Sequence, residues 1–155
     1  MTLEESKLHE LNHFAKKIRL NTLECLNHLG FGHYGGSLSV VEALAVLYGE
    51  IMPMTPDKFK ETERDYFVLS KGHAGPALYS TLYLKGFFDK DFLFSLNTNG
   101  THLPSHPDRN LTPGVDMTTG SLGQGISVAT GIAYGQKVKS LSNYTYTKVT
   151  ECFVL

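Results

Sequence analysis

The sequence is organised around the stretch Asp116-Met-Thr-Thr-Gly-Ser-Leu-Gly-Gln-Gly125, in which three glycines precede a helix-compatible run at residues 126–138. Thr118, Thr119 or Ser121 is expected to cap that helix. Glycine lets the main chain approach a ligand closely, and the N-terminus of a helix attracts anions. The stretch therefore predicts a phosphate or diphosphate site. A tight turn followed by a closely packed helix is the alternative.

The glycine spacing does not match the common nucleotide motifs. Its order is G-x-x-G-x-G, whereas dinucleotide-binding folds use G-x-G-x-x-G, and the Lys-Ser/Thr ending of a P-loop is missing. The stretch alone thus leaves the ligand open.

Composition bounds the class of protein. The 155 residues, 41% hydrophobic and 19% charged, are typical of one soluble globular domain, which we take to span 1–155. A net charge of -1 argues against nucleic acid or an anionic membrane as a partner, and no apolar run is long enough to cross a bilayer. Cys25 and Cys152 stand alone, and no signal peptide is visible, so a cytoplasmic protein is expected.

The order of predicted elements indicates an α/β fold. Helical periodicity or capping signals alternate with short apolar or β-branched runs, which favours a doubly wound parallel sheet with flanking helices. In such sheets ligands bind at the carboxyl ends of strands, so the loops after Leu69 and before Ile126 should lie together there. The predicted helices are 2–29 (with Leu8 on its apolar face), 39–49 (with a Ser39–Glu42 capping box), 77–85, 89–96 and 126–140, and the predicted strands are 66–69 and 144–147.

Three of the seven histidines lie in loops framed by glycine or proline: His33, His73 and His106. An imidazole in such a loop can donate to a phosphate oxygen or move a proton near neutral pH. A structural loop histidine is the alternative for each one. Their occurrence in three such loops, beside a diphosphate-type turn, favours a site.

Two other kinds of site are weakly supported. His102 and His106 are four residues apart, but Pro104 between them blocks a regular helix, and no cysteine or acidic residue nearby has zinc-ligand spacing. The G-x-S-x-G turn of serine hydrolases is absent.

Four stretches together resemble the N-terminal portion of a transketolase, most closely the bacterial kind that is split into two chains. They are Gly32-His-Tyr-Gly-Gly-Ser-Leu-Ser39, Arg64-Asp-Tyr-Phe-Val-Leu-Ser-Lys-Gly-His-Ala74, Ser105-His-Pro-Asp108 and Thr112-Pro-Gly-Val-Asp-Met-Thr-Thr-Gly-Ser-Leu-Gly-Gln-Gly125. The resemblance covers roughly residues 8–147. The deoxyxylulose-phosphate synthases share the general plan but resemble these loops less well.

The resemblance implies thiamine diphosphate as cofactor and transfer of a two-carbon ketol unit between sugar phosphates. It implies that His33 helps bind the sugar and move protons, that His73 faces the diphosphate, and that His106 lines the substrate channel. It also implies that the turn Gly120, Ser121, Leu122 and Gly123 wraps the diphosphate. These roles agree with the chemistry of imidazoles and of helix N-termini.

The resemblance ends before the family's metal motif. The family continues with Gly-Asp-Gly and an asparagine, which hold Mg²⁺ or Ca²⁺, whereas this chain has Val149-Thr-Glu-Cys152 and ends at Leu155. Glu151 falls near the aspartate position but lacks the glycines, so we assign no metal ligand and expect weak cofactor binding by this chain alone. A shifted reading frame at or before Lys148 could encode Gly-Asp-Gly, which predicts an interrupted gene or a sequencing error as the origin of the tail.

The resemblance also implies a partner. The glutamate that activates thiamine belongs to a second domain, so we expect a C-terminal transketolase subunit in a homo- or hetero-oligomer. The incomplete domain on its own is expected to be inactive. A non-catalytic truncated remnant that binds phosphates weakly is the alternative function, and a sugar-phosphate binding module without thiamine is a third.

Overall fold

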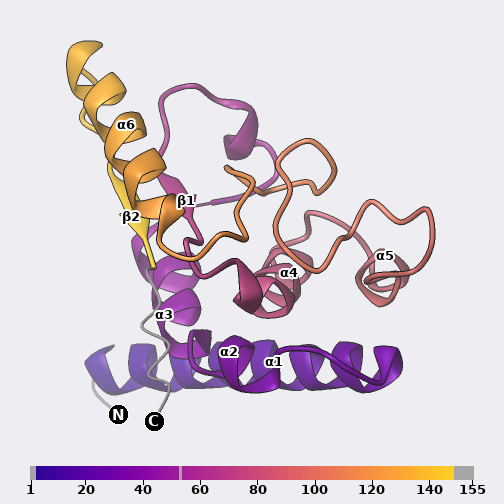
Figure 1. Ribbon diagram of the computed structural model, residues 1–155. Helices are drawn as coiled ribbons and strands as arrows, with labels where there is room; N and C mark the ends of the chain where they lie inside the picture. The colour runs from indigo at the N-terminus through magenta and orange to yellow at the C-terminus, as the bar shows by residue number, and fades with distance from the viewer. Residues whose placement is uncertain (1–2, 53, 149–155) are drawn as a thin grey trace, which may run out of the picture.

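The computed structural model describes residues 3–52 and 54–148, and Figure 1 shows its elements. In chain order these are α1 (Leu3–Leu29), α2 (Tyr34–Leu38), α3 (Val41–Val46), a π-helical turn (Leu47–Ile51), a 3-10 turn (Lys58–Lys60), β1 (Tyr66–Val68), a second 3-10 turn (Gly72–Ala74), α4 (Gly75–Leu84), α5 (Lys90–Phe94), α6 (Gln124–Val138) and β2 (Thr145–Thr147). Among these helices, none is both long and apolar enough to cross a membrane.

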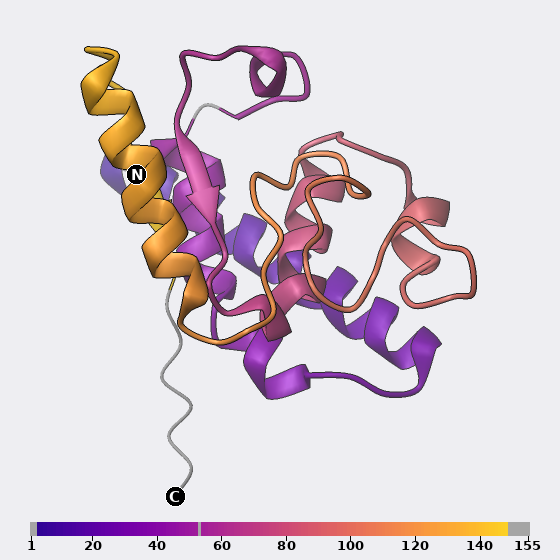
Figure 2. The same ribbon diagram turned by 45° about the horizontal axis from the view of Figure 1, so that its top comes forward.

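The two described strands form a parallel pair in which Phe67 lies opposite Tyr146. Successive side chains of a strand point to opposite faces. One face meets α6, because Thr145 donates from Oγ1 to Gln136 Oε1 (2.6 Å). On the other face the Phe67 ring packs edge-on to Tyr48, with 5.9 Å between their centroids. Figure 2 shows α6 lying along one side of β1.

This arrangement confirms the expected mixed fold in its coarser form, a small parallel sheet with helices on its two faces. The parallel pairing of two strands separated by about 75 residues of helices and loops is the crossover connection of α/β proteins. A larger doubly wound sheet stays a prediction.

The hydrophobic core lies between α1, α3 and α4. On α1 the residues Ala15, Ile18, Thr22, Cys25 and Leu26 are buried at spacings of one helical turn. They face α4, whose residues 75–82 are all buried. Burial of large apolar side chains stabilises the fold by about 1.5–3 kcal/mol each, so this helical layer supplies the platform on which the loops rest. Leu8, which the periodicity assigned to the apolar face, is 61% exposed and that assignment is wrong.

Several predicted helix ends are confirmed. The helix α1 ends at Leu29 because Gly30 adopts a φ of +84°. Asp89 caps α5 by accepting a hydrogen bond from the Phe92 N–H to its Oδ1 (2.8 Å). The helix stops at Phe94, earlier than the expected Leu96.

The predicted capping box at Ser39 is wrong. The segment expected as a continuous loop contains α2, so Ser39 follows the end of that helix instead of starting the next one. Its Oγ donates to the Gly36 oxygen (3.0 Å), and α3 begins at Val41 with no side-chain cap. The predicted cap of the last helix is also wrong, because α6 follows Gly123, with a φ of +87° and no capping side chain.

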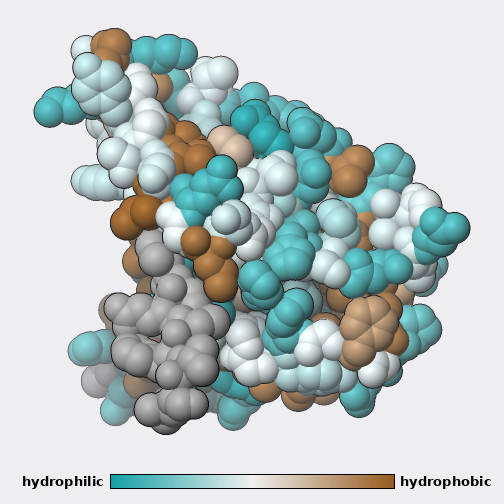
Figure 3. Space-filling view, viewed as in Figure 1, coloured by the Kyte–Doolittle hydropathy of each residue, from teal (hydrophilic) through white to brown (hydrophobic). Residues whose placement is uncertain are grey.

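The outer face of α6 carries exposed apolar side chains. Within the helix they are Ile126, Tyr134 and Val138, which are four or eight residues apart and lie on one side, and the exposed Leu122 stands just before the helix. Figure 3 shows hydrophobic side chains among polar ones over α6.

Candidate functional site

The loop that follows β1 packs directly against the glycine stretch that precedes α6. Thr119 donates from Oγ1 to the Leu69 oxygen (2.7 Å). A Cβ placed on Gly72 would stand 2.8 Å from the Gly120 main chain, and one on Gly125 would stand 2.5 Å from Ser70 Cα. Such separations exclude any side chain at Gly72 and Gly125. The structure thus confirms that the two loops meet at the carboxyl end of β1.

The three loop histidines are brought together at this junction. His33 comes from the loop between α1 and α2, His73 from the 3-10 turn after β1, and His106 from the loop after α5. The ring of His73 lies between the other two, 4.7 Å from His33 and 4.5 Å from His106 between centroids, and edge-on to both. The His33 and His106 rings are 6.0 Å apart. Residues that are far apart in sequence therefore form one cluster.

Burial and neighbouring positive charge favour the neutral forms of His73 and His106. Burial, and then the charges of His33 and Lys71, hold the pKa of His73 below its usual value. Burial, and then the neighbouring His73 and His33, lower the pKa of His106. A neutral imidazole carries one donor and one acceptor nitrogen, so it can both give and take a proton.

Four polar atoms of this region are buried without a hydrogen-bond partner: His73 Nδ1, His106 Nε2, Ser37 Oγ and Ser70 Oγ. A buried polar group without a partner costs about 1–3 kcal/mol. Such atoms are uncommon in folded proteins, and their concentration beside one loop junction is what a binding site for an oxygen-rich ligand requires.

The predicted turn Gly120–Gly123 borders the cluster. A Cβ on Gly120 would lie 3.5 Å from the His106 ring, an ordinary contact, whereas one on Gly123 would have no atom within 4 Å. Ser121, Leu122 and Gly123 are exposed, and Gln124 N donates to the Ser121 oxygen (3.2 Å) where α6 begins. The turn therefore presents its main chain beside the imidazoles at a helix N-terminus.

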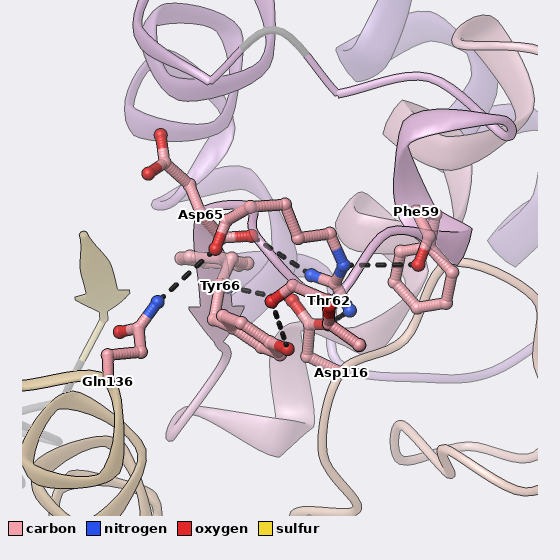
Figure 4. A network of polar contacts seen from close by, with 8 residues as sticks. Phe59, Thr62, Asp65, Tyr66, Asp116 and Gln136 are labelled. Carbon is pink, nitrogen blue, oxygen red and sulfur yellow. Dashed lines mark hydrogen bonds and ion pairs between the residues drawn. The ribbon is translucent and has the colours of Figure 1, made fainter. Parts of the chain in front are cut away.

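A buried ion pair holds the start of the glycine stretch against β1 (Figure 4). Arg64 Nη2 lies 2.6 Å from Asp116 Oδ1, and the Phe67 N–H donates to Asp116 Oδ2 (2.8 Å). The Arg64 guanidinium lies over the rings of Phe59 and Tyr66, with its Cζ 4.3 Å and 4.1 Å from the respective ring centroids. Burial raises the pKa of the Asp116 carboxyl, while Arg64 opposes that shift.

The site fits an anionic diphosphate better than a metal. The glycine contacts leave main chain, not side chains, at the N-terminus of α6, and unpartnered buried donors stand beside it. Within residues 3–52 and 54–148, no group of three His, Cys, Asp or Glu side chains is arranged to hold a metal ion. The predicted loss of the family's metal motif concerns 149–152, which lie outside the described residues.

Sequence reasoning misses several residues that build this site. Local patterns give Ser70 and Gly72 no role of their own and predict Thr119 only as a helix cap, because their contacts join segments about 50 residues apart. One signal could have found Gly72: it follows a buried strand, and a glycine at such a position indicates that another segment of main chain approaches closely. Lys71, whose charge acts on His73, is also missed, because the hydroxyl that holds its ammonium belongs to Ser39, 32 residues earlier in the chain.

Comparisons with known proteins agree with this arrangement. The family model described as "Transketolase, thiamine diphosphate binding domain" matches residues 11–151. A 6-deoxy-6-sulfo-D-fructose transketolase subunit of Clostridium sp. (strain MSTE9) is 53% identical over 138 residues, which cover 89% of this chain and 50% of the relative. An apulose-4-phosphate transketolase subunit of Phocaeicola vulgatus is 42% identical over 85% of this chain and 47% of the relative. The chain thus spans about half the length of these two relatives.

Solved structures give the same result. The transketolase of Leishmania mexicana superposes with a TM-score of 0.83 at 31% identity, over 90% of this chain and 22% of that one. The transketolase of Campylobacter jejuni superposes with a TM-score of 0.80 at 28% identity, over 97% of this chain and 24% of that one.

Proposed function

This chain belongs to the transketolase family, with whose thiamine-diphosphate-binding domain it aligns, and we propose that it is the N-terminal component of an enzyme that transfers a two-carbon ketol unit between sugar phosphates. The observation that carries the proposal is the contact of His33, His73 and His106 beside the turn that begins at Gly120. A ligand held there meets imidazoles and main-chain N–H groups together.

In this proposal the diphosphate of the cofactor is held at the N-terminus of α6. The first N–H groups of that 15-residue helix have no partner within the helix, and its dipole favours negative charge. The turn from Gly120 to Gly123, with Ser121 and Leu122, would wrap the phosphate oxygens. Ser70 Oγ and His73 Nδ1, both buried and unpartnered, supply further donors on the strand side.

In this proposal His33 and His106 act on the sugar substrate. When bound, thiamine diphosphate would supply the electron sink that lets a ketol unit leave one sugar and join another. His33 and His106 would bind sugar hydroxyls and move their protons, with the buried Nε2 of His106 as one proton-carrying atom. Burial favours the neutral imidazole at His106, because it lowers the pKa of that ring, and the neutral form is the one that accepts a proton.

We assign no metal ligand to the described residues, among which no group of three His, Cys, Asp or Glu side chains is arranged to hold a metal ion. We expect Mg²⁺ or Ca²⁺ to accompany the diphosphate, as the resemblance implies, and to be held weakly or not at all by a chain whose ligand motif is replaced at 149–152. The N–H groups and histidines would then carry the binding, and each contributes on the order of 1 kcal/mol.

A second polypeptide segment would complete the enzyme. The two relatives are named as subunits of transketolases, which supports a partnership with a C-terminal transketolase subunit in a homo- or hetero-oligomer. The exposed apolar side chains of α6 and an apolar groove of about 490 Å³ beside β2, lined by Val46, Leu47, Ile51 and Tyr146 among others, are surfaces that such a partner would cover.

Cofactor binding and catalysis can be tested separately. Thiamine diphosphate is titrated into the full chain by calorimetry, with Mg²⁺ present, for the unmodified chain, His73→Gln and the exposed α1 control His13→Gln. We expect His73→Gln to weaken binding about tenfold, since a hydrogen bond to a charged group is worth about 1.5–3 kcal/mol. Equal dissociation constants for all three would remove His73 from the site.

Ketol transfer is then measured after mixing the chain with a C-terminal transketolase subunit, thiamine diphosphate, Mg²⁺ and sugar phosphates. Turnover that requires both chains supports the proposal. Cofactor binding without turnover favours the alternative, a non-catalytic remnant that binds phosphates weakly. Binding of sugar phosphates with no binding of the cofactor would favour the thiamine-free module.

A further inference from the structure

Lys71 joins three segments that meet at the histidine cluster. Its main-chain N–H donates to the Lys148 oxygen just after β2 (3.1 Å), and its own oxygen accepts from the Ala74 N–H (2.9 Å). Its side chain reaches in the other direction and donates from Nζ to Ser39 Oγ (2.7 Å), beyond the end of α2. One residue thus connects the loop that carries His73 to the segment that follows His33.

The aliphatic part of the Lys71 side chain packs against Gly36 of α2. An added Cβ on Gly36 would stand 3.6 Å from Lys71 Cε, 3.7 Å from His33 Cβ and 3.8 Å from the His73 oxygen. Lys71 and His33 therefore both pack beside Gly36. The Lys71 side chain therefore lies between α2 and the loop that carries His73.

Lys71 is also the cation of this junction. Within the described residues no carboxylate lies within 4 Å of its ammonium, and its hydrogen-bond partner is the neutral hydroxyl of Ser39. The groups whose charges act on His73 are Lys71 from its own loop and His33 from the loop before α2. Those that act on His106 are His73 and His33. The N-terminus of α6 adds main-chain N–H groups.

We propose that Lys71 is the positioning residue of the histidine cluster: its ammonium, held by Ser39, fixes how His33 meets His73 and places a positive charge next to that pair. A positive charge beside an imidazole disfavours a second positive charge on that ring. Loss of the Lys71 ammonium should therefore both loosen the contact between His33 and His73 and raise the pKa of the His73 ring. The catalytic value of this arrangement rests on the proposed function, whereas the positioning itself does not.

The positioning role of Lys71 can be tested by NMR on the full chain without cofactor or substrate. The ring protons of His33, His73 and His106 are followed by NMR between about pH 5 and 8, the range in which imidazoles titrate, with assignments from single His→Gln variants. Lys71→Met keeps the aliphatic chain and removes the charge, Lys71→Arg keeps the charge, and Lys137→Met, on the last turn of α6, is the matched control. Amide spectra verify that each variant is folded.

We expect Lys71→Met to raise the titration midpoint of His73 and to weaken the nuclear Overhauser contact between the His33 and His73 rings. Lys71→Arg should restore the midpoint, and Lys137→Met should change neither value. Ser39→Ala retains the charge but releases the ammonium, so it should weaken the His33–His73 contact even if Lys71→Met does not fold. A wild-type His73 midpoint in Lys71→Met, or a wild-type ring contact in Ser39→Ala, would overturn the proposal. Neither result depends on whether the chain supports ketol transfer.

Discussion

The main chain of Gly125 lies so close to Ser70 that a Cβ on the glycine would stand 2.5 Å from Ser70 Cα. This contact brings the first turn of α6 onto the loop after β1. Gly125→Ala should therefore destabilise the chain by about 1–3 kcal/mol, the usual cost of overpacking. Gly131→Ala is the matched control, because Gly131 lies in the same helix with nothing within 4 Å of the added Cβ. It should stabilise by up to about 1 kcal/mol through helix propensity.

Urea unfolding of the two variants measures both values. Equal effects at Gly125 and Gly131 would mean that the helix and the loop are not in the close contact described above.

The hydrogen bond from Thr119 to Leu69 holds the glycine stretch at the end of the strand. Thr119→Val keeps the shape but leaves the buried Leu69 oxygen without this donor, so it should cost about 1–3 kcal/mol. Thr130→Val is the comparison, since Thr130 is exposed on α6 and donates to the Ile126 oxygen within the helix. Thermal unfolding should show a clear loss for the first variant and little change for the second. A reversed order would contradict the role given to Thr119.

Removing one partner of the buried Arg64–Asp116 pair should strongly destabilise the chain. The Asp116 side chain is 2% exposed, and Asp116→Ala would leave Arg64 unpaired and buried, at a cost of about 3–5 kcal/mol. Asp57→Ala breaks the exposed Lys60–Asp57 pair and should have little effect, because exposed ion pairs contribute little. Guanidinium unfolding of both variants tests this contrast. Similar small losses in both would show that Asp116 does not anchor the loop.

The histidine cluster should make stability depend on pH. Because the folded pKa values of His73 and His106 are lowered below 6.5, the unfolded chain takes up protons first as the pH falls. The contribution of these two histidines to the free energy of unfolding should therefore be constant above about pH 7 and decrease as the pH drops through about 6.5, the pKa of an unperturbed imidazole. The double variant His73→Gln, His106→Gln should flatten this dependence below about pH 7. An unchanged slope in that variant would assign the dependence to other groups.

Local patterns predicted most of the helices and both strands. The α1 face from Ala15 to Leu26 and the helix end at Gly30, the Asp89 cap, and the strand at Tyr66 all follow from short-range spacing, glycine conformation and capping chemistry, and all are confirmed. The predicted caps at Ser39 and before α6 are wrong, because their hydroxyls bond to distant or irregular segments instead. Ser39 accepts from Lys71, and Thr119 donates to Leu69. Local propensity cannot predict these hydrogen bonds, because their partners are distant in sequence.

The sequence predicted which histidines belong to the candidate site, but it did not predict how their rings are arranged. His33, His73 and His106 could be singled out because histidine in a glycine- or proline-framed loop is a chemical signal in the sequence itself. Their roles in catalysis, and those of Gly120–Gly123 in holding the cofactor, stay predictions that the experiments above address.

The sequence by itself determined the family and the kind of ligand to expect, because glycine spacing, imidazoles and strand-to-loop order are properties of short stretches. Only the tertiary structure decided that His73 stands between the two other histidines, that Gly72 and Gly125 admit no side chain, and that Lys71 reaches Ser39. Those facts depend on which segments pack together, and that is set by the burial of α1 and α4 and by the parallel pairing of β1 with β2. Packing of this kind is a property of the whole chain, so no local pattern encodes it.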